Sequence, residues 1–116
     1  MSFRFEDLQV WQKAIDLDDK INQLTKTFPK DEIYILTSQI KRAADSVVLN
    51  IAEGSTGQTK AVFKVFLSYA LRSAIEVVSC LFIAKRRPYV NEIIFDELYI
   101  EYEILVKMIT ALKNSF

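Results

Sequence analysis

Few side chains in this sequence are suited to acid–base, nucleophilic or metal chemistry. Histidine is absent and Cys80 is the only cysteine, which excludes the usual general base, an ordinary zinc site and the paired Glu-x-x-His motifs of di-iron bundles. The GSTG string at 54–57 lacks the lysine and the strand context of a phosphate-binding loop. Glu101 and Glu103 form an acidic pair, but a helix turns them in diverging directions. We therefore expect no enzyme activity, no cofactor and no bound metal.

A stripe of mixed polar residues follows one side of a helix that is predicted to end at Gly54. At about 100° per residue, the apolar residues from Ile33 to Ile51 fall on one face and the polar residues fall on another. A solvated face is usually filled with lysine and glutamate. This mixture instead favours contacts with a neighbouring helix, a second subunit or a polar ligand. The residues of the stripe are Gln39, Arg42, Ser46, Asn50 and Glu53.

Basic residues of the next helix are the candidates for contact with nucleic acid, because such groups bind backbone phosphates. Three of them, residues 85–87, close the helix, where cations also stabilise the negative end of its dipole. Ordinary surface lysines and a stabilised helix end are the alternative interpretation. Fifteen basic and fifteen acidic residues give a net charge of zero, so any electrostatic footprint must be local. The candidates are Lys60, Lys64, Arg72, Lys85, Arg86 and Arg87.

Four long helices are predicted to position these residues. Hydrophobic residues make up 51% of the 116 positions, whereas glycine and proline number only two each, which favours long helices over a many-stranded sheet. Pro29 and Pro88 mark two of the breaks. The predicted fold class is all-α, with residues 1–116 forming a single domain, an antiparallel up-down-up-down four-helix bundle. Apolar residues at helical spacing predict helices over residues 7–27, 31–53 and 92–113, and a third helix in the chain that starts after residue 56 or 59 and ends near residue 85.

Local signals predict how these helices begin and end. Residues 1–6 are expected to form a short extended arm ahead of the first helix. Gly54 is expected to stop the second helix, because glycine takes positive φ without a steric penalty. Thr56 or Thr59 is the predicted N-cap of the third helix, and Asn91 is the predicted N-cap of the fourth.

The third and fourth helices carry apolar residues on more sides than one small bundle can cover. In the third helix Val65, Ile75 and Phe82 point away from the main apolar stripe. Either the N-terminal arm covers this surface or a second subunit does, and we favour the second subunit. The sequence therefore predicts a homo-oligomer.

The expected location is the cytoplasm, with no insertion into a membrane. The N-terminus shows no apolar run behind a basic start, so no secretory signal is visible. A single cysteine fits a reducing compartment. Lys64, Arg72 and Glu76 interrupt the most apolar region of the chain, which argues against a membrane span.

Several short strings, taken in order, resemble one known family. In this spacing they resemble the bacterial four-helix-bundle proteins encoded in intervening sequences of large-subunit ribosomal RNA genes, whose name carries a ribosomal-protein label. Ser73 and Glu76 match the third-helix part of that pattern, and the resemblance covers nearly the whole chain. The chain is also similar to the accessory protein of diversity-generating retroelements. The strings are FEDL at 5–8, VW at 10–11, FPKDE at 28–32, QIKRAA at 39–44, Ser46 and NIAEG at 50–54.

The resemblance implies an antiparallel bundle that is commonly assembled as a ring-shaped pentamer. The retroelement accessory protein, to which the chain is similar, looks like a basic pentameric barrel that binds nucleic acid and a reverse transcriptase. This chain departs from the pattern at Ile35 and Arg72, where many relatives have glycine, and in its zero net charge. Carried over by position, the polar residues that would hold helices or subunits together are Arg42, Ser46, Asn50, Glu53, Ser73 and Glu76.

We predict from these observations a non-catalytic oligomeric binding protein, with a pentamer favoured, that contacts RNA, DNA or a nucleic-acid–protein complex. The alternative is a structural or protein-interaction scaffold that has a protein partner and no contact with nucleic acid. The resemblance and the basic residues favour the first function. The neutral net charge and the surplus apolar helix faces favour the second.

Overall fold

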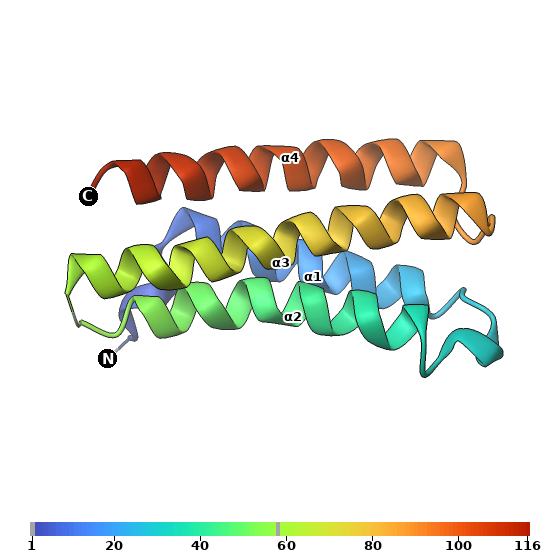
Figure 1. The fold of residues 1–116 in the computed structure, drawn as a ribbon, viewed down its shortest axis with the longest axis horizontal. Coiled ribbons are helices and arrows are strands. Elements are labelled where there is room, and N and C mark those ends of the chain that lie inside the picture. Colours follow the sequence, from blue (N-terminus) through green and yellow to red (C-terminus); the bar gives the residue numbers. More distant parts are fainter. Residues whose placement is uncertain (1, 58) are drawn as a thin grey trace.

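The computed structural model describes residues 2–57 and 59–116 and has four long helices in an antiparallel bundle (Figure 1). Helix α1 packs against α2 and α4, and α3 packs against the same two helices from the opposite corner. The bundle measures 43 × 23 × 23 Å. The predicted all-α four-helix fold is confirmed. The elements are the 3₁₀ helices η1 (Arg4–Asp7) and η2 (Lys30–Glu32) and the α-helices α1 (Gln9–Thr25), α2 (Leu36–Gly54), α3 (Lys60–Arg86) and α4 (Glu92–Asn114).

The core consists of one or two apolar residues from each turn of every helix. Alanines at 44, 70 and 74 are almost fully buried, and their small size lets helix backbones approach closely. Each fully buried leucine or isoleucine contributes about 1.5–3 kcal/mol relative to an exposed one. The central residues are Val10, Ala14, Leu17, Ile21, Ile40, Ala44, Val47, Ile51, Leu67, Ala70, Ala74, Val77, Leu81, Leu98, Tyr102, Leu105 and Ile109.

Helix α2 begins later than the sequence analysis predicted. Residues 30–32 form the short helix η2, and Ile35 adopts φ −121° and ψ −102°, outside the helical region. The chain therefore turns between η2 and α2 instead of continuing as one helix from residue 31. As a consequence Ile33, which was predicted to face the core, is 52% exposed.

The N-terminal segment also differs from the prediction. Residues 4–7 form η1 rather than an extended arm, and α1 ends at Thr25, two residues before the predicted end. Phe5 packs against Trp11 with ring centroids 4.7 Å apart, while Phe3 stacks on Phe5 at 5.8 Å. These aromatic contacts anchor η1 to α1.

Side-chain caps begin α3 and α4, as predicted. Thr59 Oγ1 accepts a hydrogen bond from the Val62 N–H at 3.1 Å, so Thr59, rather than Thr56, is the cap of α3. Asn91 Oδ1 accepts from the Ile94 N–H at 2.8 Å at the start of α4. Each cap satisfies a backbone donor that the first turn of a helix leaves free.

Gly54 is required by packing and not by backbone conformation. Among the described residues only Gly57 has a positive φ, of 87°, so the prediction that Gly54 ends α2 by that means is wrong. A Cβ at position 54 would lie 2.7 Å from Phe66 Cβ and 2.9 Å from Phe63 Cδ1. Only a residue without a side chain lets the end of α2 lie this close to α3.

Replacing Gly54 with alanine is expected to destabilise the fold by about 1–3 kcal/mol, the usual cost of overpacking. The added methyl group would collide with Phe66 Cβ, which is bonded directly to the α3 backbone and cannot rotate away. Urea unfolding followed by circular dichroism measures the change. Thr56→Ala, at an exposed site nearby, is the control and should stay within about 0.5 kcal/mol. A Gly54→Ala variant as stable as the parent would contradict the packing argument.

Candidate functional site

The polar stripe predicted on α2 lies beside α3 and joins the two helices. Gln39 Nε2 donates to Glu76 Oε2 at 2.6 Å, and Ser73 Oγ donates to Ser46 Oγ at 2.9 Å. Asn50 Nδ2 donates to the carbonyl and the hydroxyl of Ser46, at 2.8 and 2.9 Å, within its own helix. We call these five residues the α2–α3 polar seam. Of the interpretations left open, contact with a neighbouring helix is the one that the geometry supports for Gln39 and Ser46.

Arg42 and Glu53, the two other residues of the predicted stripe, do not join the seam. Both are exposed, and neither forms an ion pair with another described residue. Hydrogen bonds such as those of the seam contribute about 0.5–1.5 kcal/mol each. The main consequence of the two that cross between helices is to fix the register of α2 against α3, since a shift by one turn would break the Gln39–Glu76 and Ser46–Ser73 hydrogen bonds together.

Two of the predicted nucleic-acid contacts take part in ion pairs within the fold. Lys85 Nζ lies 3.1 Å from Glu92 Oε1 and 4.4 Å from the centre of the Phe95 ring, so it fastens the end of α3 to α4. Arg87 Nη1 lies 2.8 Å from Glu32 Oε2. These two cations stabilise the junctions between helices, and each already lies beside a carboxylate of the same chain.

The four other predicted basic contacts do not form one patch. Lys60 and Lys64 lie at the start of α3, Arg72 is near its middle, and Arg86 is at its end. With a rise of about 1.5 Å per residue, the first and last of these are about 39 Å apart along the helix. Lys60, Arg72 and Arg86 are exposed, whereas Lys64 is half-buried.

Glu32 is the centre of a buried polar cluster that sequence analysis did not find. Its side chain is 7% exposed and accepts hydrogen bonds from the Tyr89 hydroxyl and the Arg87 guanidinium, both at 2.8 Å. The Tyr89 hydrogen bond and then the Arg87 guanidinium hold the pKa of Glu32 below its ordinary value, against the effect of burial. The cluster ties η2 to the turn between α3 and α4. No local spacing reveals that residues 32, 87 and 89 meet.

A cavity of about 280 Å³ lies where the end of α1, η2 and α2 meet. Three lysines line it, one just after the last residue of α1, one in η2 and one in α2. Its lining includes no acidic side chain, and none of the three lysines forms an ion pair with another described residue. Thr37 Oγ1 in the same lining is buried without a hydrogen-bond partner among the described residues. We call Lys26, Lys30 and Lys41 the lysine cluster. It concentrates positive charge in a protein whose net charge is zero.

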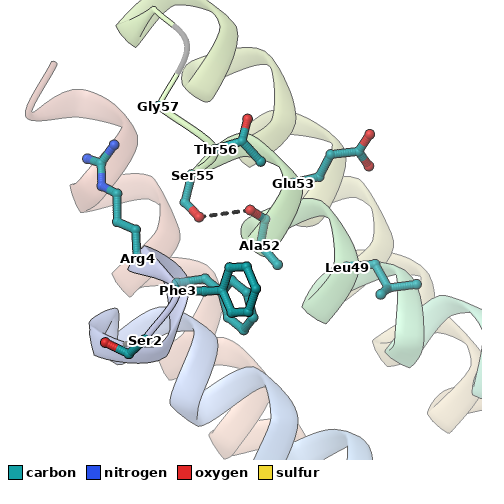
Figure 2. Close-up of a pocket in the computed structure, with 10 residues that line it drawn as sticks. Ser2, Phe3, Arg4, Leu49, Ala52, Glu53, Ser55, Thr56 and Gly57 are labelled. Atoms are coloured by element: carbon teal, nitrogen blue, oxygen red, sulfur yellow. Dashed lines mark hydrogen bonds between the residues drawn. The ribbon is translucent and has the colours of Figure 1, made fainter.

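A larger groove, of about 860 Å³, runs between the N-terminal segment and the end of α2 (Figure 2). Phe3, Leu49 and Ala52 give it apolar walls. Ser55 Oγ donates to the Ala52 carbonyl at 2.8 Å, as the dashed line in Figure 2 shows. Mostly apolar walls suit an apolar group better than a charged ligand.

Carboxylates at the α1–α2 contact form a second cluster that sequence analysis missed. Asp18 of α1 and Asp45 of α2 share a hydrogen bond. Burial, followed by this hydrogen bond and the nearby charges of Asp45 and Asp19, raises the pKa of Asp18 to about 7, and Lys41 opposes the shift. Burial, with smaller effects from Asp18 and Asp45, also raises the pKa of Tyr102. The described residues nevertheless hold no group of three metal-ligating side chains.

The outer surfaces of α3 and α4 expose large apolar side chains, as the sequence pattern indicated. In α4 these are Ile93, Ile94, Tyr99, Ile100 and Ile104. By length and composition alone α3 is apolar enough to cross a membrane, a property that core helices of soluble proteins share. The large apolar side chains that α3 exposes are Val65, Tyr69, Ile75, Phe82 and Ile83, and we call these five residues the exposed α3 face.

Comparison with known proteins agrees with this geometry. The model of the 23S rRNA-intervening sequence protein family matches residues 6–111. The chain belongs to this family. A crystal structure of a member of the S23 ribosomal protein family from Bacteroides thetaiotaomicron, described as having unknown function, superposes with a TM-score of 0.84.

The two sequences are 23% identical, and the alignment covers 90% of the present chain and 95% of the Bacteroides chain. At that identity the likeness shows the fold. A search of curated proteins finds no match. The resemblance stated from the sequence strings is therefore confirmed at the level of family and fold.

The Asp18–Asp45 pair predicts how stability depends on pH. The pKa of Asp18 is about 7 in the folded protein, above the value of about 3.9 expected in the unfolded chain. The pair's contribution to stability is therefore complete below about pH 4 and is lost as the pH rises through 7. Asp18→Asn should flatten the dependence between about pH 4 and 7 and raise the melting temperature at about pH 8.

Urea unfolding across this pH range measures the effect of Asp18→Asn. Asp16→Asn, which changes an exposed carboxylate of the same helix, is the matched control and should keep the slope of the parent protein. Parallel curves for the parent and Asp18→Asn would show that the two carboxylates do not share a proton.

Proposed function

We propose that this protein is a non-catalytic, homo-oligomeric binding protein whose copies associate through the exposed α3 face. The observation that carries the proposal is the set of apolar side chains that α3 exposes, with Ile75 60% exposed. Soluble proteins seldom expose contiguous apolar surfaces unless another molecule covers them. Covering one such isoleucine contributes about 1.5–3 kcal/mol.

A ring of five copies is the proposed assembly, because the family resemblance implies a pentamer. A ring requires a heterologous contact, in which one surface of a copy meets a different surface of the next. The polar seam supports this arrangement, because it satisfies its hydrogen bonds within one copy and so leaves apolar burial as the source of association energy.

Native mass spectrometry at micromolar concentration tests the assembly. The parent protein is expected at five times the chain mass of 13.4 kDa. Ile75→Glu should shift the population to smaller species, because it places a charge in the contact, while Gln23→Glu on exposed α1 surface should not. A parent protein found at the mass of one chain would refute self-association. Flotation of that single chain with lipid vesicles would indicate that lipid covers α3 instead.

Contact with RNA is a second proposed function, and the lysine cluster supports it. Three unpaired cations around one cavity suit a backbone phosphate. Exposed Arg86 lies at the same end of the bundle, since the neighbouring Arg87 reaches Glu32 of η2. Tyr34, in the adjoining turn, is 91% exposed, and an exposed aromatic ring of this kind can stack on a base.

Fluorescence anisotropy with labelled structured RNA and duplex DNA, at about 50–200 mM salt, tests this contact. Replacing all three lysines of the cluster with alanine should weaken binding at least about tenfold and lower the salt slope by about three. The control, Lys60→Ala with Lys64→Ala at the far end of α3, should change binding much less. A parent protein that binds neither nucleic acid at the lowest salt would favour the scaffold function. If only the Lys60→Ala, Lys64→Ala control loses affinity for nucleic acid, the nucleic-acid contact lies at the start of α3 and not at the lysine cluster.

A further inference from the structure

The surface of α4 that faces away from the core carries a regular stripe. Ile93, Ile100 and Lys107 are spaced by seven residues, and Glu97, Ile104 and Ala111 repeat at the same interval, offset by four. All six side chains are exposed. These spacings are those of the a and d positions of a coiled coil, which form the seam between two helices. We call these six residues the outer α4 stripe.

The outer α4 stripe is symmetric about the level of Tyr102. Ile100 and Ile104 lie two residues before and after that position, and Glu97 and Lys107 lie five residues before and after it. Ile93 and Ala111 lie nine residues to either side. A second α4 helix that runs antiparallel and is centred on the same level would therefore present complementary partners along the whole stripe.

We propose that two copies of this protein pair through their α4 helices, antiparallel, across a two-fold axis at the level of Tyr102. Ile100 then packs against Ile104 of the second copy, and Ile93 packs against Ala111, a large residue against a small one. Glu97 faces Lys107 of the second copy. The contact is isologous, because the same stripe serves on both copies.

Charge selects the antiparallel orientation. In a parallel pair Glu97 would face the same glutamate of the second copy, and Lys107 would face the same lysine, so both charged layers would be repulsive. Lys107 has only a loose contact within its own chain, 4.0 Å from Glu103 Oε1, and both side chains of that pair are at least half exposed. It is therefore free to turn toward Glu97 of the second copy.

The pairing rests on the proposed self-association but not on the α3 contact. The exposed α3 face and the outer α4 stripe lie on different helices, so α4 is available in any ring whose second contact surface is not the outer α4 stripe. Two-fold pairing through α4 would then join two rings, or two single copies if no ring forms.

Site-specific cross-linking tests the orientation. Ile93→Cys and Ala111→Cys are prepared separately, and each is oxidised alone and in a one-to-one mixture; buried Cys80 serves as the internal control in the parent protein. In the antiparallel pair positions 93 and 111 of opposite copies meet, whereas two copies of position 93 are about 27 Å apart. We expect cross-linked dimer from the mixture and little from either variant alone. Cross-linking of Ile93→Cys alone would overturn the antiparallel register.

A charge exchange tests the same pairing without cysteines. Glu97→Lys and Lys107→Glu should each weaken dimer formation roughly tenfold in sedimentation equilibrium, because each creates like-charged layers. The double variant restores opposite charges and should recover the parent affinity. If the parent protein associates and neither single variant weakens the association, the α4 pairing is overturned and the proposed self-association stands. A single-chain mass for the parent protein would overturn both.

Discussion

The close approach of α2 and α3 is the constraint on which the other features of this fold depend. Gly54 allows it at one end, since a Cβ there would lie 2.7 Å from Phe66 Cβ, and the buried small residues Ala44 and Ala70 allow it nearer the middle. The polar seam then fixes the register, with the hydroxyls of Ser46 and Ser73 2.9 Å apart. Because α3 is held on one side by α2 and on the other by α4, its third side is left outward and apolar.

Periodicity and capping chemistry were sufficient to predict the helices, because both depend on residues close together in sequence. The caps at Thr59 and Asn91 are examples. The late start of α2 could not be predicted in this way. Glu32 is held in η2 by Arg87 and Tyr89, which lie more than fifty residues further on. The spacing of residues within the segment from 28 to 36 does not indicate that Arg87 and Tyr89 contact it.

The same limit applies to the charged residues. The candidate basic residues share one helix in the sequence, but the fold brings Lys85 and Arg87 of that group into ion pairs with carboxylates of other segments. The lysine cluster was missed because its members belong to three segments that converge only after the chain turns at η2. The raised pKa of Asp18 depends on the α1–α2 contact, where Asp45 lies beside it, in the same way.

The structure also changes the interpretation of the mixed polar stripe of α2, because it shows which residues lie beside it. Such a mixture fits a ligand site or a subunit contact equally well on sequence grounds, but Gln39, Ser46 and Asn50 are engaged within the chain. Specificity for another molecule must then come from surfaces that remain unsatisfied. Apolar α3 and α4 can supply association energy, and the sparse charges set among the isoleucines of α4 can supply orientation, since desolvating a mismatched charge costs more than burying an isoleucine gains.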